Sequence, residues 1–414
     1  MEIVFKTVCG LDVHKETVVA CVRTFEEGAK RPKKEVRTFA AHRRGLTELR
    51  TWLVESKVEA VAMEGTGIYW RPVYAALEGE VPWSLVVGNA QHIKNVPGRK
   101  TDVKDAEWLA ELVGHGLIRP SFIPTPEFRE LRDVTRHRSV WIADRTRDRN
   151  RVLKVLQLAG IKLDGVASDA FGKSGMAILR ELAEGTATPQ QMAELARGVL
   201  RKKIDALTIA LESPLGPTHR RMLAIALERL DATEKSIAKY DALIDEMLLP
   251  YAEQMKLLMT IPGVDRVVAA SMLAELGPDM SVFPSDGHAA SWAGVCPGNH
   301  VSAGKKSSGA TSPGDRPLKR MLCQAAQAAA HTKKGYLRDK FYRIKARRGH
   351  NCAIMAIAHK ILVAAYHILR DLVPYQDLGD NYLDKRDKDR VVAGLVSRLR
   401  SLGLECTLTP APAV

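Results

Sequence analysis

The sequence predicts an α/β domain at the N-terminus, followed by a mostly helical remainder. Two observations lead to this prediction. Short runs rich in β-branched residues alternate with helical patterns over residues 1–125. Longer helical patterns then dominate, over residues 126–250 and 251–375, and a polar tail occupies residues 376–414. We therefore expect four parts with these boundaries.

The N-terminal part has the element order of a mixed sheet. The β-branched runs predict strands at residues 4–11, 17–25, 36–40, 60–63 and 84–87. Helical patterns lie between or after them, at residues 42–56, 69–77 and 102–113. Strands in succession, followed by strands that alternate with helices, are typical of an RNase H-like sheet, although other mixed sheets share this order.

Residues 126–250 predict a helical arm. Residues 128–156 are rich in arginine, and a second helical pattern runs over residues 219–249 and stops at Pro250. Apolar residues of this second pattern repeat at spacings near three and four, as in a coiled-coil seam: Leu230, Ile237, Tyr240, Ile244 and Met247. A less regular helical insert at 164–211 separates the two patterns. We interpret the region as a spacer or oligomerisation arm.

The third part combines a Pro-Gly turn and a basic loop with helical patterns at residues 267–276, 318–331 and 352–369. The turn Ile261-Pro262-Gly263-Val264 is compatible with a helix–hairpin–helix phosphate clip and equally with an ordinary turn. The loop 294–314 is rich in Gly, Ser and Lys, so its backbone, Lys305 and Lys306 can meet phosphates. A serine in this loop could act as a nucleophile if a base or a metal activates it. The sequence is equally compatible with a basic loop that only binds the DNA backbone.

Charge points to a polyanionic partner. The 414 residues include 62 Lys and Arg against 48 Asp and Glu, a net charge of +14, which suits nucleic acid and would also suit an anionic membrane. Residues 333–350 hold eight Lys and Arg against Asp339 alone, with Tyr336, Phe341 and Tyr342 interleaved, which favours backbone contacts with stacking over a merely solvated helix face.

Several classes of protein are disfavoured. No uninterrupted apolar run has the length of a membrane span, and the first residues lack the pattern of a secretory signal. The six cysteines are scattered without a CxxC pair, which argues against a zinc ribbon or a disulfide framework. We expect a cytoplasmic, nucleoid-associated protein.

Four acids predict a metal site. Asp12 ends the first strand, Glu64 follows the fourth, and Asp102 and Asp105 are three residues apart, on one helix face. Each alone has an ordinary explanation as a turn, capping or first-turn residue. Together they offer the oxygen ligands that hard divalent cations take, and two ions ~3.5–4 Å apart assist phosphodiester displacement. We therefore predict two Mg²⁺ or Mn²⁺ ions here.

Two neighbouring residues are left out of this predicted site. His14 lies two residues after Asp12 and is interpreted as a polar neighbour, because a histidine there is more often that than a ligand. Glu107 is an alternative acid, but its helical phase differs from that of Asp102 and Asp105.

An ordered series of motifs resembles the DEDD transposases of the insertion sequence 110 family. From about residue 5 to 372 the series reads GLDVHK, MEGTG, KTDVKDAEWLAEL, IPGV, WAGVCPGNHVSAGKKSSG and RRGHNCAIMAIAHKIL. The long insert between the two ends is similar to that of the large-insert subgroup. The resemblance implies a RuvC-like RNase H fold, with Asp12, Glu64, Asp102 and Asp105 as the DEDD acids. It also implies that Ser302 is a nucleophile that links covalently to DNA.

The resemblance further implies DNA partners, namely element ends and target, and for some members a guide RNA. We expect a homo-oligomer, dimer or tetramer, from the coiled-coil-like arm. Residues 310–314 lack the basic residues of many relatives, so we expect the phosphate contacts there to move to Arg316, Lys319 and Arg320. With the lysines of the loop and arginines of the basic stretch, the predicted nucleic-acid-binding residues are Lys305, Lys306, Arg316, Lys319, Arg320, Arg343, Arg347 and Arg348. Ser307 and Ser308 keep the choice of nucleophile open.

Two other functions compete with this interpretation. The first is a RuvC-like junction-resolving nuclease that uses water as its nucleophile and the C-terminal part only to bind DNA. The second is a non-catalytic DNA- or RNA-binding protein. In that case, replacing Asp102 and Asp105 by Asn should leave function intact.

Overall fold

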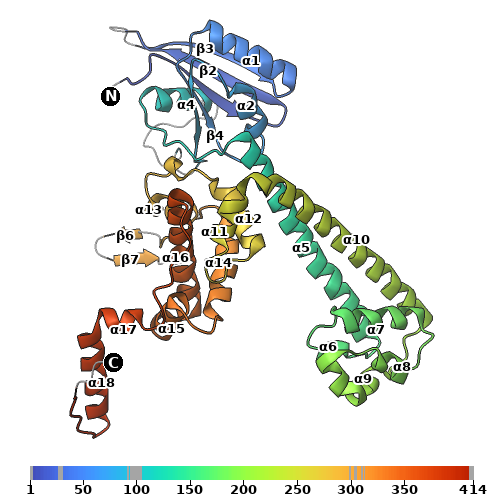
Figure 1. Ribbon diagram of the computed structural model, residues 1–414. Coiled ribbons are helices and arrows are strands. Elements are labelled where there is room, and N and C mark those ends of the chain that lie inside the picture. The colour runs from blue at the N-terminus through green and yellow to red at the C-terminus, as the bar shows by residue number, and fades with distance from the viewer. Residues whose placement is uncertain are drawn as a thin grey trace. The chain divides into compact units, whose positions relative to one another are not determined.

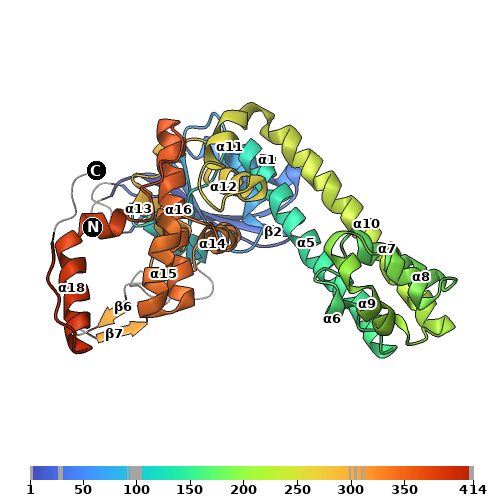
Figure 2. The same ribbon diagram turned by 60° about the horizontal axis from the view of Figure 1, so that its bottom comes forward.

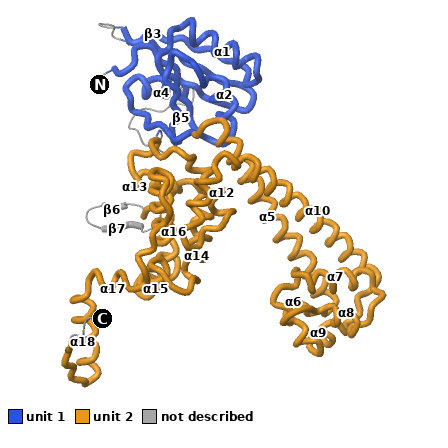
Figure 3. Tube along the Cα trace, viewed as in Figure 1, with its two compact units in different colours: residues 1–123 blue, residues 124–414 orange. Residues whose placement is uncertain are grey.

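The computed structural model describes residues 3–26, 31–90, 93, 105–297, 300–302, 305–308, 311 and 313–409, with backbone alone for 300–302 and 305–308. The chain divides into two compact units, residues 1–123 and residues 124–414 (Figure 3). The first contains a five-stranded sheet, and the second is almost entirely helical.

The first unit is a mixed sheet. Its strands are β1 (Thr7–Val13), β2 (Thr17–Thr24), β3 (Lys33–Ala40), β4 (Ala60–Glu64) and β5 (Ser84–Gly88). They lie in the order β3-β2-β1-β4-β5, with β1, β2 and β3 antiparallel, β4 parallel to β1, and β5 parallel to β4. The predicted mixed sheet is confirmed, and its order is consistent with an RNase H-like domain.

Helices cover both faces of this sheet (Figure 1). On one face, α1 (Arg43–Glu55) and α2 (Trp70–Leu77) pack on a core that includes Leu11 and Met63. On the other face, α4 (Asp105–Gly114) packs on Val8, Ala60 and Ala62. Because side chains alternate along a strand, every second residue of β1 and β4 faces α4.

The second unit begins with a helical arm. α5 (Pro126–Leu158) and α10 (Pro217–Leu248) run antiparallel, as Figure 2 shows, and ion pairs such as Arg138–Asp241 and Arg229–Asp148 join them. The insert between them folds into α6 (Leu163–Val166), α7 (Lys173–Glu184), α8 (Pro189–Glu194), the 3-10 helix η1 (Gly198–Lys203) and α9 (Ile204–Leu211). These pieces share a hydrophobic core with the far ends of α5 and α10.

The predicted seam of α10 packs within the chain. Leu230, Ile237 and Ile244 are buried, whereas Tyr240 and Met247 are partly exposed. Since α10 pairs along its length with α5, the partner of the seam is a helix of the same chain. The seam therefore gives no reason of its own to expect a second subunit.

The rest of the second unit is a helical bundle. It comprises η2 (Leu249–Tyr251), α11 (Ala252–Leu258), α12 (Arg266–Leu276), η3 (Met280–Val282), α13 (Asp286–Trp292), α14 (Arg316–Ala330), α15 (Tyr336–Arg348) and α16 (His350–Asp371). Among the described helices, α16 alone is long and apolar enough to cross a membrane, with a mean hydropathy of 1.8. Its packing against α11, α13, α14 and α15 explains that composition.

The structure corrects one sequence-based expectation in this unit and adds secondary structure to another. The loop predicted over 294–314 contains an antiparallel pair of strands, β6 (His300–Ser302) and β7 (Lys305–Ser308). The predicted polar tail contains two helices, α17 (Tyr382–Arg386) and α18 (Lys388–Ser401). In both places the polar composition concealed regular backbone structure, because side-chain patterning is a weak signal where few residues are buried.

Candidate active site

Asp12 and Glu64 lie at one edge of the sheet. Leu11 of β1 is the register partner of Met63 of β4, and the two acids follow these residues directly in parallel strands. Gly10 and Ala62, two residues earlier, lie on the α4 side of the sheet. By the alternation of side chains, Asp12 and Glu64 also face that side.

α4 carries Asp105 to the same edge. The carbonyl of Gly114, at the end of α4, accepts hydrogen bonds from the amides of Val4 and Phe5 before β1, at 2.9 and 3.3 Å. Near its start, α4 lies against Gly10, where a Cβ would stand 2.1 Å from the carbonyl oxygen of Ala106. The helix therefore runs opposite to β1, and Asp105, its first residue, lies where β1 ends.

Polar neighbours hold the two strand-end acids. His14 Nε2 lies 3.1 Å from the Asp12 carboxylate, whose side chain is 33% exposed. The hydroxyl of Thr66 donates a hydrogen bond to Glu64 Oε1. Glu107, the alternative acid on α4, instead accepts a hydrogen bond from Lys34 Nζ of β3 at 2.9 Å. Glu107 thus serves the packing of α4 on the sheet.

The donor chemistry fits a hard divalent cation. Asp102, the fourth predicted acid, lies outside the described residues. Within the described ranges, no three His, Cys, Asp or Glu side chains come together closely enough to hold a metal ion. Asp12, Glu64 and Asp105 nevertheless bring carboxylate oxygens to one edge and one face, and these are ligands of Mg²⁺ and Mn²⁺. The fit rests on ligand type and placement, not on a closed cluster.

Ser302 lies on a β-hairpin whose two ends are held together by backbone contacts. Ser302 ends β6 and is the register partner of Lys305 in β7. Pro297, before β6, and Thr311, after β7, form an antiparallel bridge. Gly314 has a positive φ of 50°, and a Cβ there would stand 2.2 Å from the amide nitrogen of Gly294. We call residues 293–314 the serine hairpin.

Comparison with known proteins identifies the family. Residues 9–161 match the model of the DEDD transposases of insertion sequence 110, and residues 255–343 match that of the transposase IS116/IS110/IS902 family. The first match includes the sheet with its acids, and the second includes the serine hairpin. The chain belongs to the insertion sequence 110 family of transposases. It is accordingly an enzyme that cleaves and rejoins DNA.

Two relatives of this transposase are proteins of insertion elements. An uncharacterised 44.8 kDa protein of IS116 from Streptomyces clavuligerus is 26% identical over 344 residues, which cover 75% of this chain and 84% of the relative. An uncharacterised 42 kDa protein of IS900 from Mycobacterium paratuberculosis is 25% identical over 346 residues, covering 72% of this chain and 84% of the relative.

A buried network of ion pairs contacts the end of the serine hairpin of the transposase. Glu275 of α12 is 2% exposed and accepts hydrogen bonds of 2.8 Å on both oxygens from Arg136 of α5. Arg136 also contacts Asp315, the residue after the hairpin, at 3.0 Å. Burial raises the pKa of Glu275, although the hydrogen bond from Arg136 opposes this rise. A carboxylate buried at this depth requires such partners.

The residue before the hairpin is tied to the same network. Arg132 of α5 contacts Glu275 at 3.0 Å and lies over the ring of Trp292, 5.5 Å from its centre. The carbonyl of Trp292 accepts a hydrogen bond of 3.1 Å from the amide of Asp315. Both ends of the serine hairpin are therefore attached to α5, the first helix of the arm.

The predicted nucleic-acid-binding residues differ in their surroundings. Arg316, Arg320, Arg347 and Arg348 are exposed, and Lys319 donates a hydrogen bond to the hydroxyl of Thr311. Lys305 and Lys306 lie on β7, where only the backbone is described. Arg343 is bound to Asp339, at 2.8 Å, and to Asp384 of α17. The hydrogen bond with Asp384 raises the pKa of Arg343, whose position joins α17 to α15.

The Pro-Gly turn before α12 is explained by packing. At Gly263, which has a positive φ of 87°, a Cβ would stand 2.3 Å from the carbonyl oxygen of Ala325 in α14. Asp265 caps α12 by accepting a hydrogen bond of 2.9 Å from the amide of Val268. A carboxylate at the helix start competes with a phosphate for those amides. The ordinary-turn interpretation is therefore favoured over the phosphate clip.

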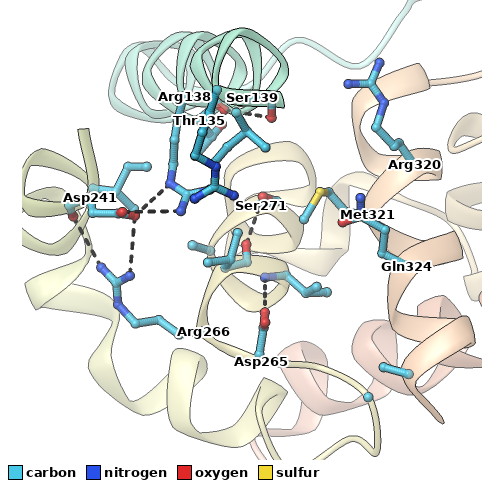
Figure 4. Close-up of a pocket in the computed structure, with 18 residues that line it drawn as sticks. Thr135, Arg138, Ser139, Asp241, Asp265, Arg266, Ser271, Arg320, Met321 and Gln324 are labelled. Atoms are coloured by element: carbon cyan, nitrogen blue, oxygen red, sulfur yellow. Dashed lines mark hydrogen bonds and ion pairs between the residues drawn. The ribbon is translucent and has the colours of Figure 1, made fainter. Parts of the chain in front are cut away.

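The pocket beside this turn is lined by arginines and aspartates (Figure 4). It has a volume of about 330 Å³ and lies among α5, α10, α12 and α14. Asp241 binds Arg138 at 2.7 Å and approaches Arg266 at 3.7 Å, and Asp245 also binds Arg266. The ion pairs of Arg138 and Arg266 with these carboxylates join α5 and α12 to α10 at this pocket.

The interpretation of His14 as a polar neighbour of Asp12 agrees with the 3.1 Å contact between the two side chains. Sequence reasoning missed two other residues at or near the site, Thr66 and Glu275. Thr66 stands two positions after Glu64, and this spacing alone could have placed it on the same side. Glu275 is a lone acid in the apolar segment Ala269–Leu276. An acid in such a segment needs a buried cation, and the arginine-rich residues 128–156 are the natural source.

Proposed function

We propose that this transposase cuts and rejoins DNA by transesterification with Ser302 as the nucleophile. The Oγ atom of Ser302 attacks a phosphodiester, and the bond formed to phosphorus replaces the bond broken to the leaving sugar oxygen. Because one phosphate ester is exchanged for another, rejoining needs no ATP. Residues 1–125 would form the catalytic domain with the acids, 126–250 the arm, and 251–375 the domain that bears the serine.

Asp12, Glu64, Asp102 and Asp105 would hold two divalent ions, Mg²⁺ or Mn²⁺. The observation that carries this proposal is the placement of Asp12, Glu64 and Asp105 at one edge and on one face of the sheet. When bound, such ions stabilise charge on the attacking and leaving oxygens. His14 and Thr66 would orient the carboxylates of Asp12 and Glu64 through the contacts they make.

Trapping of a protein–DNA adduct tests the nucleophile. Wild-type transposase is incubated with DNA of the element ends and Mg²⁺, then denatured and resolved by electrophoresis. We expect a covalent adduct that is absent from Ser302→Ala, while this variant keeps its affinity for DNA. Ser307→Ala and Ser308→Ala are matched controls from the same hairpin and should form the adduct. An adduct from Ser302→Ala would assign the attack to another residue.

The same experiment separates the transposase mechanism from hydrolysis. A RuvC-like nuclease that activates water would cleave the DNA and leave no protein attached. Cleavage by the wild-type protein without any adduct would therefore favour the nuclease and restrict residues 251–375 to binding.

We propose further that the transposase works as a homo-oligomer in the cytoplasm, at the nucleoid, with a guide RNA encoded beside its gene. The net charge of +14 supports the binding of RNA in addition to DNA, because both are polyanions. Light scattering of the purified protein measures the oligomer, and sequencing of RNA that copurifies with it identifies the guide. A monomer free of RNA that still recombines DNA would contradict both proposals.

A further inference from the structure

A groove opens beside the base of the serine hairpin. It has a volume of about 700 Å³, and its walls are formed by α15 and α16. Val295 and Pro297, which precede β6, line it, and so does Thr311, which follows β7 and forms a bridge with Pro297. Any ligand in this groove therefore lies next to the element that carries Ser302.

The charged residues of the groove are all cationic. Lys340, Arg347, Arg348 and Lys360 line it, and no acid is among the lining residues that the structure describes. Within the described part of the chain, none of these four side chains forms an ion pair with a carboxylate. Arg343 of α15, in contrast, binds two acids. The charges of the lining are thus available to an anionic ligand.

The groove also has an apolar part to its lining. Val295, Pro297, Ile344, Met355 and Ala356 line it together with His359. Burial lowers the pKa of His359, which favours the neutral ring. A neutral imidazole can donate and accept hydrogen bonds. A lining of apolar side chains, a polar ring and cationic side chains suits nucleotide bases flanked by phosphates.

The size of the groove favours single-stranded over double-stranded nucleic acid as its ligand. Its volume falls within the ~300–1,000 Å³ of pockets that enclose a small molecule, which leaves room for a nucleotide or two and none for a duplex. We propose that this groove binds unpaired nucleotides of the DNA strand on which the serine hairpin acts. The proposal rests on the proposed function, because the position beside Ser302 is what favours the DNA strand over other single strands.

Protection of Cys352 from alkylation tests the groove without any chemistry at the serine. Cys352 is exposed and lines the groove, whereas Cys406 lies in the tail and is not among the residues that line it. Ser302→Ala protein is treated with N-ethylmaleimide, with and without oligothymidylate of a length within the ~4–16 nucleotides typical of single-strand sites. Modified cysteines are counted by mass spectrometry.

We expect DNA at ten times its Kd to slow alkylation of Cys352 about tenfold, since only the unbound fraction reacts. The rate at Cys406 should not change. Duplex DNA of equal length should protect weakly. Equal rates with and without DNA would overturn the proposal, and stronger protection by oligouridylate would reassign the groove to RNA. Neither outcome depends on whether Ser302 forms an adduct, so the two proposals fail separately.

Charge variants locate the contact. Lys360→Ala should lower the slope of log affinity against log salt for single-stranded DNA by about 0.7, the value for one phosphate contact. Lys345→Ala is the matched control, because Lys345 is an exposed cation of α15 that does not line the groove. An unchanged slope in Lys360→Ala would exclude Lys360 from the phosphate path and contradict the proposed site.

Discussion

Replacement of Gly10 by alanine should separate Asp105 from Asp12. A Cβ at Gly10 would stand 2.1 Å from the carbonyl oxygen of Ala106, 2.4 Å from the amide nitrogen of Ala110 and 2.9 Å from the Cβ of Leu109, whereas ordinary contact begins at 3.4 Å. These atoms belong to the backbone and first side-chain carbons of α4, so they cannot rotate away. The helix must move off β1 by roughly 1 Å, and Asp105 must move with it.

Two effects of Gly10→Ala follow from this displacement. Overpacking of this kind typically costs about 1–3 kcal/mol of unfolding free energy. A misplacement of ~1 Å at a catalytic group can cost ~100-fold in rate. Urea unfolding measures the first, and the rate of DNA cleavage with Mg²⁺, in conditions where the variant is folded, measures the second.

Gly394→Ala is the matched control for Gly10→Ala. Gly394 lies in α18, where a Cβ would meet nothing within 4 Å. Alanine there should stabilise the protein by up to about 1 kcal/mol and leave cleavage unchanged. The reasoning is refuted if Gly10→Ala keeps both the stability and the cleavage rate of the wild type, because the position of α4 on β1 would then not matter.

Two further predictions concern the second unit. Glu275→Ala leaves Arg132 and Arg136 without their buried carboxylate. Urea unfolding should therefore report a loss of about 3–5 kcal/mol in the free energy of unfolding, and formation of the protein–DNA adduct should slow. If both quantities keep their wild-type values, the network does not support the hairpin. Burial opposes ionisation of Asp148, which is 1% exposed, but hydrogen bonds from Arg229, Thr233 and Arg151 outweigh burial and lower its pKa. Its stabilising contribution is therefore complete above the unfolded-state pKa of ~3.9 and is lost as pH falls through the lower folded value. Asp148→Asn should lose this acid sensitivity, measured by circular dichroism of the full chain during acid titration, and an identical titration curve would contradict the assignment.

The sheet was predictable from the sequence because its strands are buried. β-branched runs marked β1, β2, β4 and β5 to within three residues at each end, and the strand ends then located Asp12 and Glu64. The start of β3, at Lys33, was missed because its first residues are charged and exposed. Pattern reasoning depends on a buried face, and this stretch has none.

The support of the serine hairpin was not predictable from sequence. β6 and β7 are short and hold polar residues, so no alternation marks them. The network of Glu275, Arg132 and Arg136 joins residues about 140 positions apart in the chain. Only the fold brings such residues together, because nothing in local spacing connects them.

Binding of Mn²⁺ tests the central claim most directly. Electron paramagnetic resonance counts bound Mn²⁺ per chain in the presence of DNA, and we predict about two ions for the wild type and fewer for Asp12→Asn. Glu107→Gln is the control, since Glu107 lies on the same helix as Asp105 but pairs with Lys34, and it should bind as many ions as the wild type. If Asp12→Asn also binds as many ions as the wild type, the carboxylates at this edge of the sheet are not the metal ligands.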